Sequence, residues 1–281
     1  MNYLAMRIDR VTCPDNNGQH HIVYSDWGNH DANSTVLCLH GLTRNRHDFD
    51  LLARYLMTDY RVICVDVVGR GDSDYLTDPK QYHYSTYVKD IFSLLQQLGL
   101  DKIDLIGTSM GGLIGLHLAA LANSPIKRLI LNDIGPIVPQ EALARIARYI
   151  RQHTFPDLAS ISAHLRQRYA SFGPLTESQW QHVIEHSIQH LPTGEYCLAY
   201  DPEIAQTFHS DKVANLWTTW LAVKQPILLL HGEQSDVLPF PVVEQMQASR
   251  PDLCVVHIPN TGHSPMLMSS DQMEIVGNWL G

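Results

Sequence analysis

The residues with the clearest capacity for chemistry centre on Ser109, which lies in the sequence Gly107-Thr108-Ser109-Met110-Gly111. The apolar run before it is typical of a buried strand, and the run from Gly112 to Ala122 is typical of a helix. A serine on a sharp turn between a strand and a helix has an exposed hydroxyl, and only residues with little side chain fit on either side of it. The spacing therefore predicts a nucleophilic serine.

A serine hydroxyl becomes a good nucleophile only when a histidine accepts its proton. His263 stands out among the 16 histidines because it lies in Asn260-Thr261-Gly262-His263-Ser264-Pro265, after the last expected strand. Catalytic groups of open parallel sheets gather at the carboxyl ends of the strands. We therefore predict that His263 is the base.

A carboxylate must hold that histidine in the correct tautomer, and two aspartates compete for this position. Asp236 lies just beyond the end of one expected strand, and Asp133 follows another. Asp133 can also be interpreted as the cap of the turn before Gly135-Pro136. We favour Asp236 as the acid.

An oxyanion formed during attack needs preorganised backbone N–H donors. The amide of Met110 is one candidate, because it begins a helix whose dipole favours an anion. The loop after the early strand Val36–Leu39 should supply the second donor, and we predict the amide of Leu42. His40, in the same loop, is interpreted as a structural residue that holds the loop in place.

The elements that must position these residues alternate along the chain. Residues 7 to 27 predict an antiparallel hairpin with a turn at Asn17-Gly18. Short apolar runs then predict strands buried on both faces, and helical patterns separate most of them. These runs are Val36–Leu39, Arg61–Asp66, Ile103–Ile106, Leu129–Leu131, Pro226–Leu230 and Cys254–Ile258. The order predicts an α/β fold with a mostly parallel central sheet flanked by helices.

The interval between Leu131 and Pro226 is too long for one crossover and has helical patterns of its own. In Pro139–Gln152, apolar residues such as Leu143 and Ile146 share one face. We therefore expect a helical cap at 136–215, inserted between a first core segment at 1–135 and a second at 216–281.

Five short motifs together resemble the α/β-hydrolase superfamily over nearly the whole chain outside the cap. They are HGL at 40–42, DVVGRGDS at 66–73, GTSMGG at 107–112, HGEQSD at 231–236 and GH at 262–263. The resemblance implies the α/β-hydrolase fold with a triad in the chain order Ser109, Asp236, His263. DVVGRGDS is similar to a turn of that family in which glycines allow close packing, so we assign it to structure.

The resemblance specifies the substrate poorly, because the superfamily contains many activities. Members that cleave C–halogen bonds or epoxides use an aspartate nucleophile, whereas this chain has Ser109. Thr108 and Ser264 stand where C–C bond hydrolases typically carry asparagine and tryptophan. We expect hydrolysis of a small or medium carboxylic ester through an acyl-enzyme, without a cofactor. The alternatives are C–C bond hydrolysis of a diketone-like substrate by the same triad, and a small-molecule receptor with residual hydrolysis.

Composition limits the partners. The 281 residues carry a formal net charge of −9 with no basic cluster, which argues against nucleic acid or an anionic membrane as a partner. No apolar run approaches the length of a membrane-spanning helix. The first nine residues lack the features of a secretory signal, so we expect a cytoplasmic protein. The expected partner is a small-molecule ester, and the oligomeric state is left open.

The remaining notable residues receive structural interpretations. His182, His186 and His190 recur at helical spacing opposite an apolar face, so we expect them in solvent rather than on a metal. The five cysteines show no disulfide or metal spacing and are interpreted as core residues, with Cys254 inside a buried strand. Seven aromatic residues are expected mainly to pack the core or cap: Tyr169, Phe172, Trp180, Tyr196, Tyr200, Trp217 and Trp220.

Overall fold

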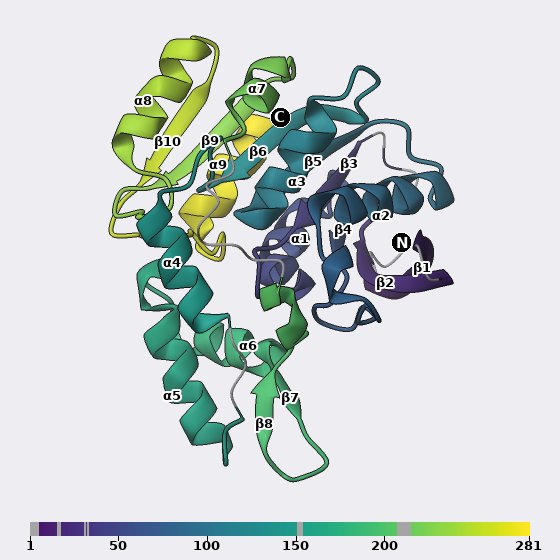
Figure 1. Ribbon diagram of the computed structural model, residues 1–281. Coiled ribbons are helices and arrows are strands. Elements are labelled where there is room, and N and C mark those ends of the chain that lie inside the picture. Colours follow the sequence, from purple (N-terminus) through teal and green to yellow (C-terminus); the bar gives the residue numbers. More distant parts are fainter. Residues whose placement is uncertain (1–5, 16–17, 31, 33, 151–153, 207–214) are drawn as a thin grey trace.

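The central feature of the computed structural model is an eight-stranded sheet with the strand order β1-β2-β4-β3-β5-β6-β9-β10 (Figure 1). The structure describes residues 6–15, 18–30, 32, 34–150, 154–206 and 215–281. The strands are β1 (Met6–Asp15), β2 (Gly18–Trp27), β3 (Thr35–Leu39), β4 (Arg61–Val65), β5 (Ile103–Thr108), β6 (Ile126–Asn132), β9 (Ile227–Gly232) and β10 (Cys254–Ile258). All six strands predicted after the hairpin are confirmed.

The strand directions follow the predicted change from a hairpin to crossovers. β1 pairs with β2, and β2 pairs with β4, in the antiparallel sense, whereas β4, β3, β5, β6, β9 and β10 pair in parallel. Of the expected hairpin turn, Gly18 begins β2 with φ +143°, and Asn17 lies outside the described residues. Strands β3, β4, β5 and β9 are buried along their whole length, as near-continuous apolar runs predict.

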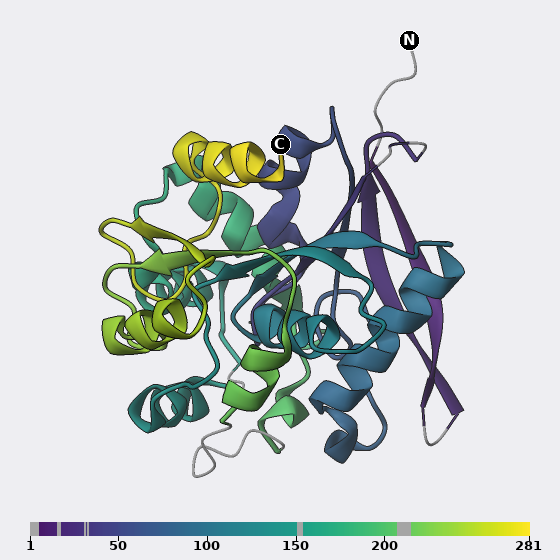
Figure 2. The same cartoon turned by 90° about the horizontal axis from the view of Figure 1, so that it is seen from above.

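Helices cover both faces of the sheet. Helices α1 (Asp50–Leu56) and α9 (Ser270–Leu280) pack on one face, and Figure 2 shows them together on that side. The other face is covered by α2 (Tyr84–Gln97), α3 (Met110–Ala119), α7 (Trp217–Ala222) and α8 (Phe240–Ser249). Two short 3-10 helices, η1 (Arg46–Phe49) and η2 (Pro79–Gln81), lie in the connecting loops. The apolar core therefore has two layers, one on each side of the sheet.

Between β6 and α7 the chain leaves the sheet and forms a separate layer, which we call the insertion. It contains α4 (Gln140–Tyr149), α5 (Leu158–Arg168), η3 (Ala170–Phe172), α6 (Glu177–Ser187), the hairpin β7 (Ile188–His190) with β8 (Tyr196–Leu198), and η4 (Pro202–Gln206). These elements gather on one side of the molecule (Figure 1). Residues 151–153 and 207–214 of the expected cap lie outside the described residues, so its limits at 136 and 215 stay a prediction.

The prediction of a buried Cys254 is wrong. Cys254 begins β10, the last strand at one edge of the sheet, and its side chain is exposed. An edge strand has a neighbour on one side only, so an apolar run there is less covered than in a central strand. The other four cysteines are buried, as expected. Within the described residues, no helix is both long and apolar enough to cross a membrane.

Candidate active site

Ser109 lies at a sharp turn between β5 and α3, as the glycine spacing predicts. Its backbone has φ 51° and ψ −113°, an unusual conformation for a residue with a side chain, and its amide donates to the Asn132 carbonyl at 3.1 Å. A Cβ on Gly107 would lie 2.5 Å from the Gly111 backbone, and a Cβ on Gly111 would lie 2.1 Å from the Leu39 carbonyl oxygen. Both positions therefore require glycine.

His263 lies in the loop between β10 and α9 and reaches Ser109, as predicted. Its Nε2 is 2.8 Å from Ser109 Oγ, which is the distance of a hydrogen bond. The His263 side chain is only 9% exposed, so the bond is shielded from solvent. A proton can pass directly from the hydroxyl to the ring.

Asp133 is the carboxylate that holds His263, so the prediction of Asp236 is wrong. His263 Nδ1 lies 2.7 Å from Asp133 Oδ2. The same oxygen accepts from Ser235 Oγ at 2.6 Å, and Oδ1 accepts from the Gly232 amide at 2.8 Å. Asp133 is completely buried and has φ 55°. Three donors from two other segments therefore fix the orientation of this carboxylate.

The position of Asp236 explains the error. Its side chain is 50% exposed and forms an ion pair with Arg145 across the surface, with distances of 2.6 and 2.8 Å. Asp133 is the first residue after β6, the neighbour of β5, whereas Asp236 follows β9 after a turn of three residues that carries it outwards. Asp133 thus directly follows a strand that lies next to β5, the strand before Ser109. This was the signal that favoured Asp133.

The loop after β3 is held in a defined orientation by His40, as predicted. His40 Nδ1 donates to the Gly41 carbonyl at 2.7 Å, and its Nε2 accepts from the Val67 amide at 3.0 Å. Burial lowers the pKa of His40 to about 3, so the ring is neutral, in agreement with one donor and one acceptor nitrogen. In a trans peptide the N–H points opposite to the carbonyl, so the Leu42 amide points away from His40.

Arg70 holds the same loop from the other side. Its Nε donates to the Leu42 carbonyl at 2.9 Å, and the side chain is completely buried. Arg70 belongs to the DVVGRGDS turn, where a Cβ on Gly71 would lie 2.3 Å from Asp66 Oδ2. Leu42 and Met110 both line the same pocket as Ser109, and Met110 is the first residue of α3. The amide of such a residue has no acceptor within its own helix.

The pocket beside Ser109 lies between the core and the insertion and has a volume of about 120 Å³. From the core it is lined by Leu42, Thr43, Ser109, Met110 and His263, and from the insertion by Leu143, Ile146, Tyr149, Arg168, Tyr169 and Phe172. Tyr169 and Phe172 thus line the pocket, whereas the other five aromatic residues singled out in the sequence pack in the apolar core or against it. Three arginines that were not predicted from the sequence also line the pocket: Arg44, Arg145 and Arg168.

The prediction that the α6 histidines lie in solvent is wrong for His182 and His186. The His186 ring stacks on His47 of η1 at 3.7 Å, and His182 Nε2 lies 3.6 Å from Asp50 Oδ2. This face of α6 is therefore a contact between the insertion and the core. His190 lies in β7 and not on the helix, and it is exposed as expected. The ligand atoms of His47, Asp50 and His186 lie within 4.8 Å of one another, but stacked rings do not direct their nitrogens to one point.

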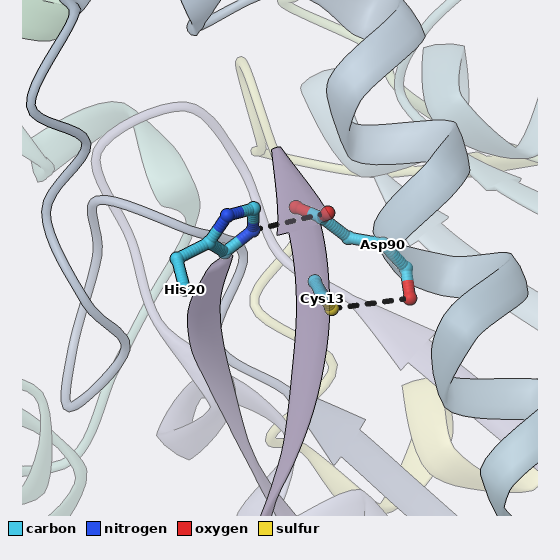
Figure 3. Close-up of side chains that lie close together, drawn as sticks. All are labelled: Cys13, His20 and Asp90. Carbon is cyan, nitrogen blue, oxygen red and sulfur yellow. Dashed lines mark hydrogen bonds and ion pairs between the residues drawn. The ribbon is translucent and has the colours of Figure 1, made fainter. Parts of the chain in front are cut away.

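A second cluster of titratable groups lies between the β1-β2 hairpin and α2 (Figure 3). His20 Nε2 is 3.0 Å from Asp90 Oδ1, His20 Nδ1 is 3.4 Å from Asp15 Oδ2, and Cys13 Sγ points to the Asp90 carbonyl. Burial opposes the charge on His20, yet Asp90 and Asp15 raise its pKa above the usual value. The cluster therefore acts as an ion-pair network that fastens the hairpin to α2.

The fold and the strand-turn-helix serine define the class of this protein, and comparison with known proteins gives the same result. The family described as alpha/beta hydrolase fold matches residues 34–268, and the chain belongs to this family. The chain is 38% identical to the 3-hydroxybutyrate-oligomer hydrolase of Cupriavidus necator over 96% of both sequences.

Two solved structures are similar over nearly the full length of the chain. A putative hydrolase from Rickettsia typhi has 33% identity and a TM-score of 0.92, with 99% of each chain covered. An α/β hydrolase from Novosphingobium aromaticivorans has 32% identity and a TM-score of 0.87, with 100% of this chain and 99% of that chain covered. The relatives are hydrolases, which supports an enzymatic role for this chain.

Proposed function

We propose that this protein is a serine hydrolase that cleaves a carboxylic ester through an acyl-enzyme. The observation that carries the proposal is the hydrogen-bonded chain from Ser109 through His263 to Asp133 at the wall of a pocket. Ser109 is the nucleophile, His263 the general base and acid, and Asp133 the group that orients His263.

In the first half of the reaction, Ser109 Oγ attacks the ester carbonyl carbon while its proton passes to His263 Nε2. The carbonyl oxygen becomes an oxyanion, and the amides of Leu42 and Met110 donate hydrogen bonds to it. The tetrahedral intermediate then collapses, the C–O bond to the alcohol breaks, and the proton on His263 moves to the leaving alcohol. The product of this half-reaction is an ester of Ser109.

In the second half, water attacks the acyl carbon of that ester and gives a proton to His263. The second tetrahedral intermediate uses the same two amides and collapses with release of the carboxylic acid. His263 returns its proton to Ser109 Oγ, so the enzyme ends in its starting state. Asp133 keeps its hydrogen bond to His263 Nδ1 and stabilises the positive charge on the ring in both halves.

The pocket supports a short acyl group. A cavity of about 150 Å³ accommodates a molecule such as benzene, and the pocket here is about 120 Å³. The Cupriavidus necator relative is a 3-hydroxybutyrate-oligomer hydrolase. We therefore propose short esters of this hydroxyacyl type as the first substrates to test.

Two experiments test the function. A fluorophosphonate probe should label Ser109, identified by mass mapping of the adduct, and Ser109→Ala should abolish labelling. Nitrophenyl esters from acetate to palmitate, and linear 3-hydroxybutyrate dimer and trimer, should be hydrolysed with a preference for short acyl chains. An active protein labelled at another residue, or a rate maximum at palmitate with interfacial activation, would contradict the proposal.

The division into core segments at 1–135 and 216–281 and a cap at 136–215 is part of the proposal, supported by the separate layer that the insertion forms. A cytoplasmic location is also proposed, since all five cysteines are free thiols, as is usual where thiols are kept reduced. We propose a small-molecule ester as the partner, rather than nucleic acid or membrane, because the net charge is −9.

A further inference from the structure

The arginines of the pocket differ in how their charges are compensated. Arg44 forms an ion pair with Asp48, with Nε 3.0 and 3.1 Å from the two carboxylate oxygens. Arg145 forms its ion pair with Asp236. Each of these cations is therefore neutralised by a carboxylate of the protein.

Arg168, the last residue of α5, has no such partner in the described part of the chain. Its Nη2 donates to Thr43 Oγ1 at 3.0 Å, its side chain also interacts with the Tyr200 hydroxyl, and its Nε and Nη1 are buried without a well-aligned acceptor in that part of the chain. The groups that act on its charge are the tyrosines Tyr149, Tyr169 and Tyr200. A guanidinium stays charged at every physiological pH, and two buried N–H donors without acceptors are costly.

Arg168 lines the pocket between aromatic side chains. The guanidinium carbon lies 4.3 Å from the centroid of the Tyr149 ring and 5.5 Å from that of Tyr169, and both rings line the pocket. At these distances the aromatic rings stabilise the positive charge of the guanidinium without neutralising it. Thr43, which accepts a hydrogen bond from Arg168, directly follows Leu42, so the positive charge lies close to the proposed oxyanion site.

The same charge affects the neighbouring tyrosine. Burial disfavours ionisation of Tyr169, yet its pKa lies below the usual value because the guanidinium groups of Arg168 and Arg44 face it. This part of the pocket therefore has a positive potential that favours an anion. Asp133 does not line the pocket and is bonded to three donors, so it does not compensate Arg168.

We propose that Arg168 binds a free carboxylate of the substrate, so that the enzyme selects esters that are themselves acids. The guanidinium of Arg168 lines the pocket, and no carboxylate of the described residues pairs with it, so a carboxylate of the substrate can form a charged hydrogen bond with it. The inference rests on the proposed ester hydrolysis and narrows it to anionic esters, such as a linear hydroxyacyl oligomer with a free acid end.

The test compares one ester with and without its charge. The linear 3-hydroxybutyrate dimer and its methyl ester are assayed with the wild type, Arg168→Met and Arg168→Lys. We expect Arg168→Met to lower kcat/KM for the acid about 10- to 100-fold and for the methyl ester less than about threefold, as for loss of a charged hydrogen bond. Arg168→Lys keeps the positive charge but not the guanidinium, so it should retain part of the selectivity. It also shows the effect if the methionine variant fails to fold.

Arg166→Met is the matched control, because Arg166 lies on the same helix, pairs with Glu177 and does not line the pocket. It should leave the acid-to-ester ratio of kcat/KM unchanged. An equal loss on both substrates in Arg168→Met, or no loss on either, would overturn the carboxylate site. Wild-type enzyme that cleaves only the methyl ester would overturn it as well, while leaving ester hydrolysis intact.

A binding measurement separates this inference from the proposed reaction. Calorimetric titration of Ser109→Ala with 3-hydroxybutyrate should give a Kd that rises at least about tenfold when Arg168→Met is added. Binding that does not depend on Arg168 would overturn the carboxylate site. If no ester is cleaved by the wild type but binding depends on Arg168, the proposed function fails and the carboxylate site stands.

Discussion

The core and the insertion form the two walls of one pocket, but they differ in how strongly the structure constrains which residue type occupies each position. In the core, backbone geometry leaves little choice: Gly107 and Gly111 have no room for a side chain, and Asp133 is bonded to three donors. In the insertion, Leu143 and Phe172 contribute apolar surface that other side chains could also supply. We therefore expect the core to determine the reaction and the insertion to determine which substrate is accepted.

The largest effect should come from the core nucleophile. Ser109→Ala should lower kcat about 10⁶-fold, by analogy with triads whose members act as a unit. The fold should be unaffected, because the hydroxyl takes part in the bond to His263 and not in core packing. Steady-state kinetics and thermal unfolding measure the two quantities. A variant that keeps a tenth of the activity would show that another residue is the nucleophile.

The next effect compares the two aspartates. Asp133→Asn should lower kcat about 10⁴-fold, because an amide holds the imidazole in the wrong tautomer. Asp236→Asn should change kcat less than about threefold, since Asp236 forms only an exposed ion pair with Arg145. Rates on nitrophenyl acetate give the comparison. A severe loss in Asp236→Asn with a mild one in Asp133→Asn would contradict the assignment.

A smaller effect is expected in the insertion. Phe172 lines the pocket and stacks on Tyr169 at 4.7 Å, so Phe172→Ala should shift the preference among acyl lengths by about 10- to 200-fold. Labelling of Ser109 by the fluorophosphonate should persist. Leu158→Ala, at a position 48% exposed on α5, is the control and should leave the preference unchanged. Loss of labelling in Phe172→Ala would mean that the insertion helps to assemble the catalytic groups.

The smallest effect concerns the contact between the two regions. Burial, and then the neighbouring His47 and His182, lower the pKa of His186 to about 4, against about 6.5 in an unfolded chain. Below pH 6.5 the unfolded chain binds this proton more readily than the folded one, so stability is lost as the pH falls towards 4.

His186→Phe keeps a ring to stack on His47 but cannot take up a proton. On lowering the pH from 7 to 5, the Tm of the wild type should fall about 2–4 °C more than that of His186→Phe. Thermal unfolding at a series of pH values measures the difference. Parallel curves for the two proteins would show that the contact does not titrate.

The same contrast explains what the sequence could and could not predict. Fully buried strands such as β3 and β4 have apolar runs that follow directly from their burial, and the glycines around Ser109 follow from local crowding. His263 and His40 were identified because a loop after a strand is a short-range feature. These predictions required only the neighbours of each residue along the chain.

The failures required knowledge of which distant segments meet. Asp133 and Asp236 both follow strands, and the place of β6 beside β5 brings Asp133 to the side of the site. His186 has a polar position on its own helix, but η1 covers that position. In the sequence, Arg168 is an ordinary basic residue near the end of a helix. Only the structure shows that the rings of Tyr149 and Tyr169 lie beside it.

The far end of the insertion is fastened to the core by several hydrogen bonds. Asn45 Nδ2 donates to the His186 carbonyl at 2.6 Å, the Gly71 amide donates to Ala199 at 2.9 Å, and the Asp201 amide donates to Gly69 at 2.8 Å. We do not expect an insertion that is hydrogen-bonded to the core at these points to open as a hinged lid. Entry of substrate and release of product should therefore depend on rotation of side chains at the pocket mouth, which takes ps to ns. They should not require domain opening, which takes µs to ms.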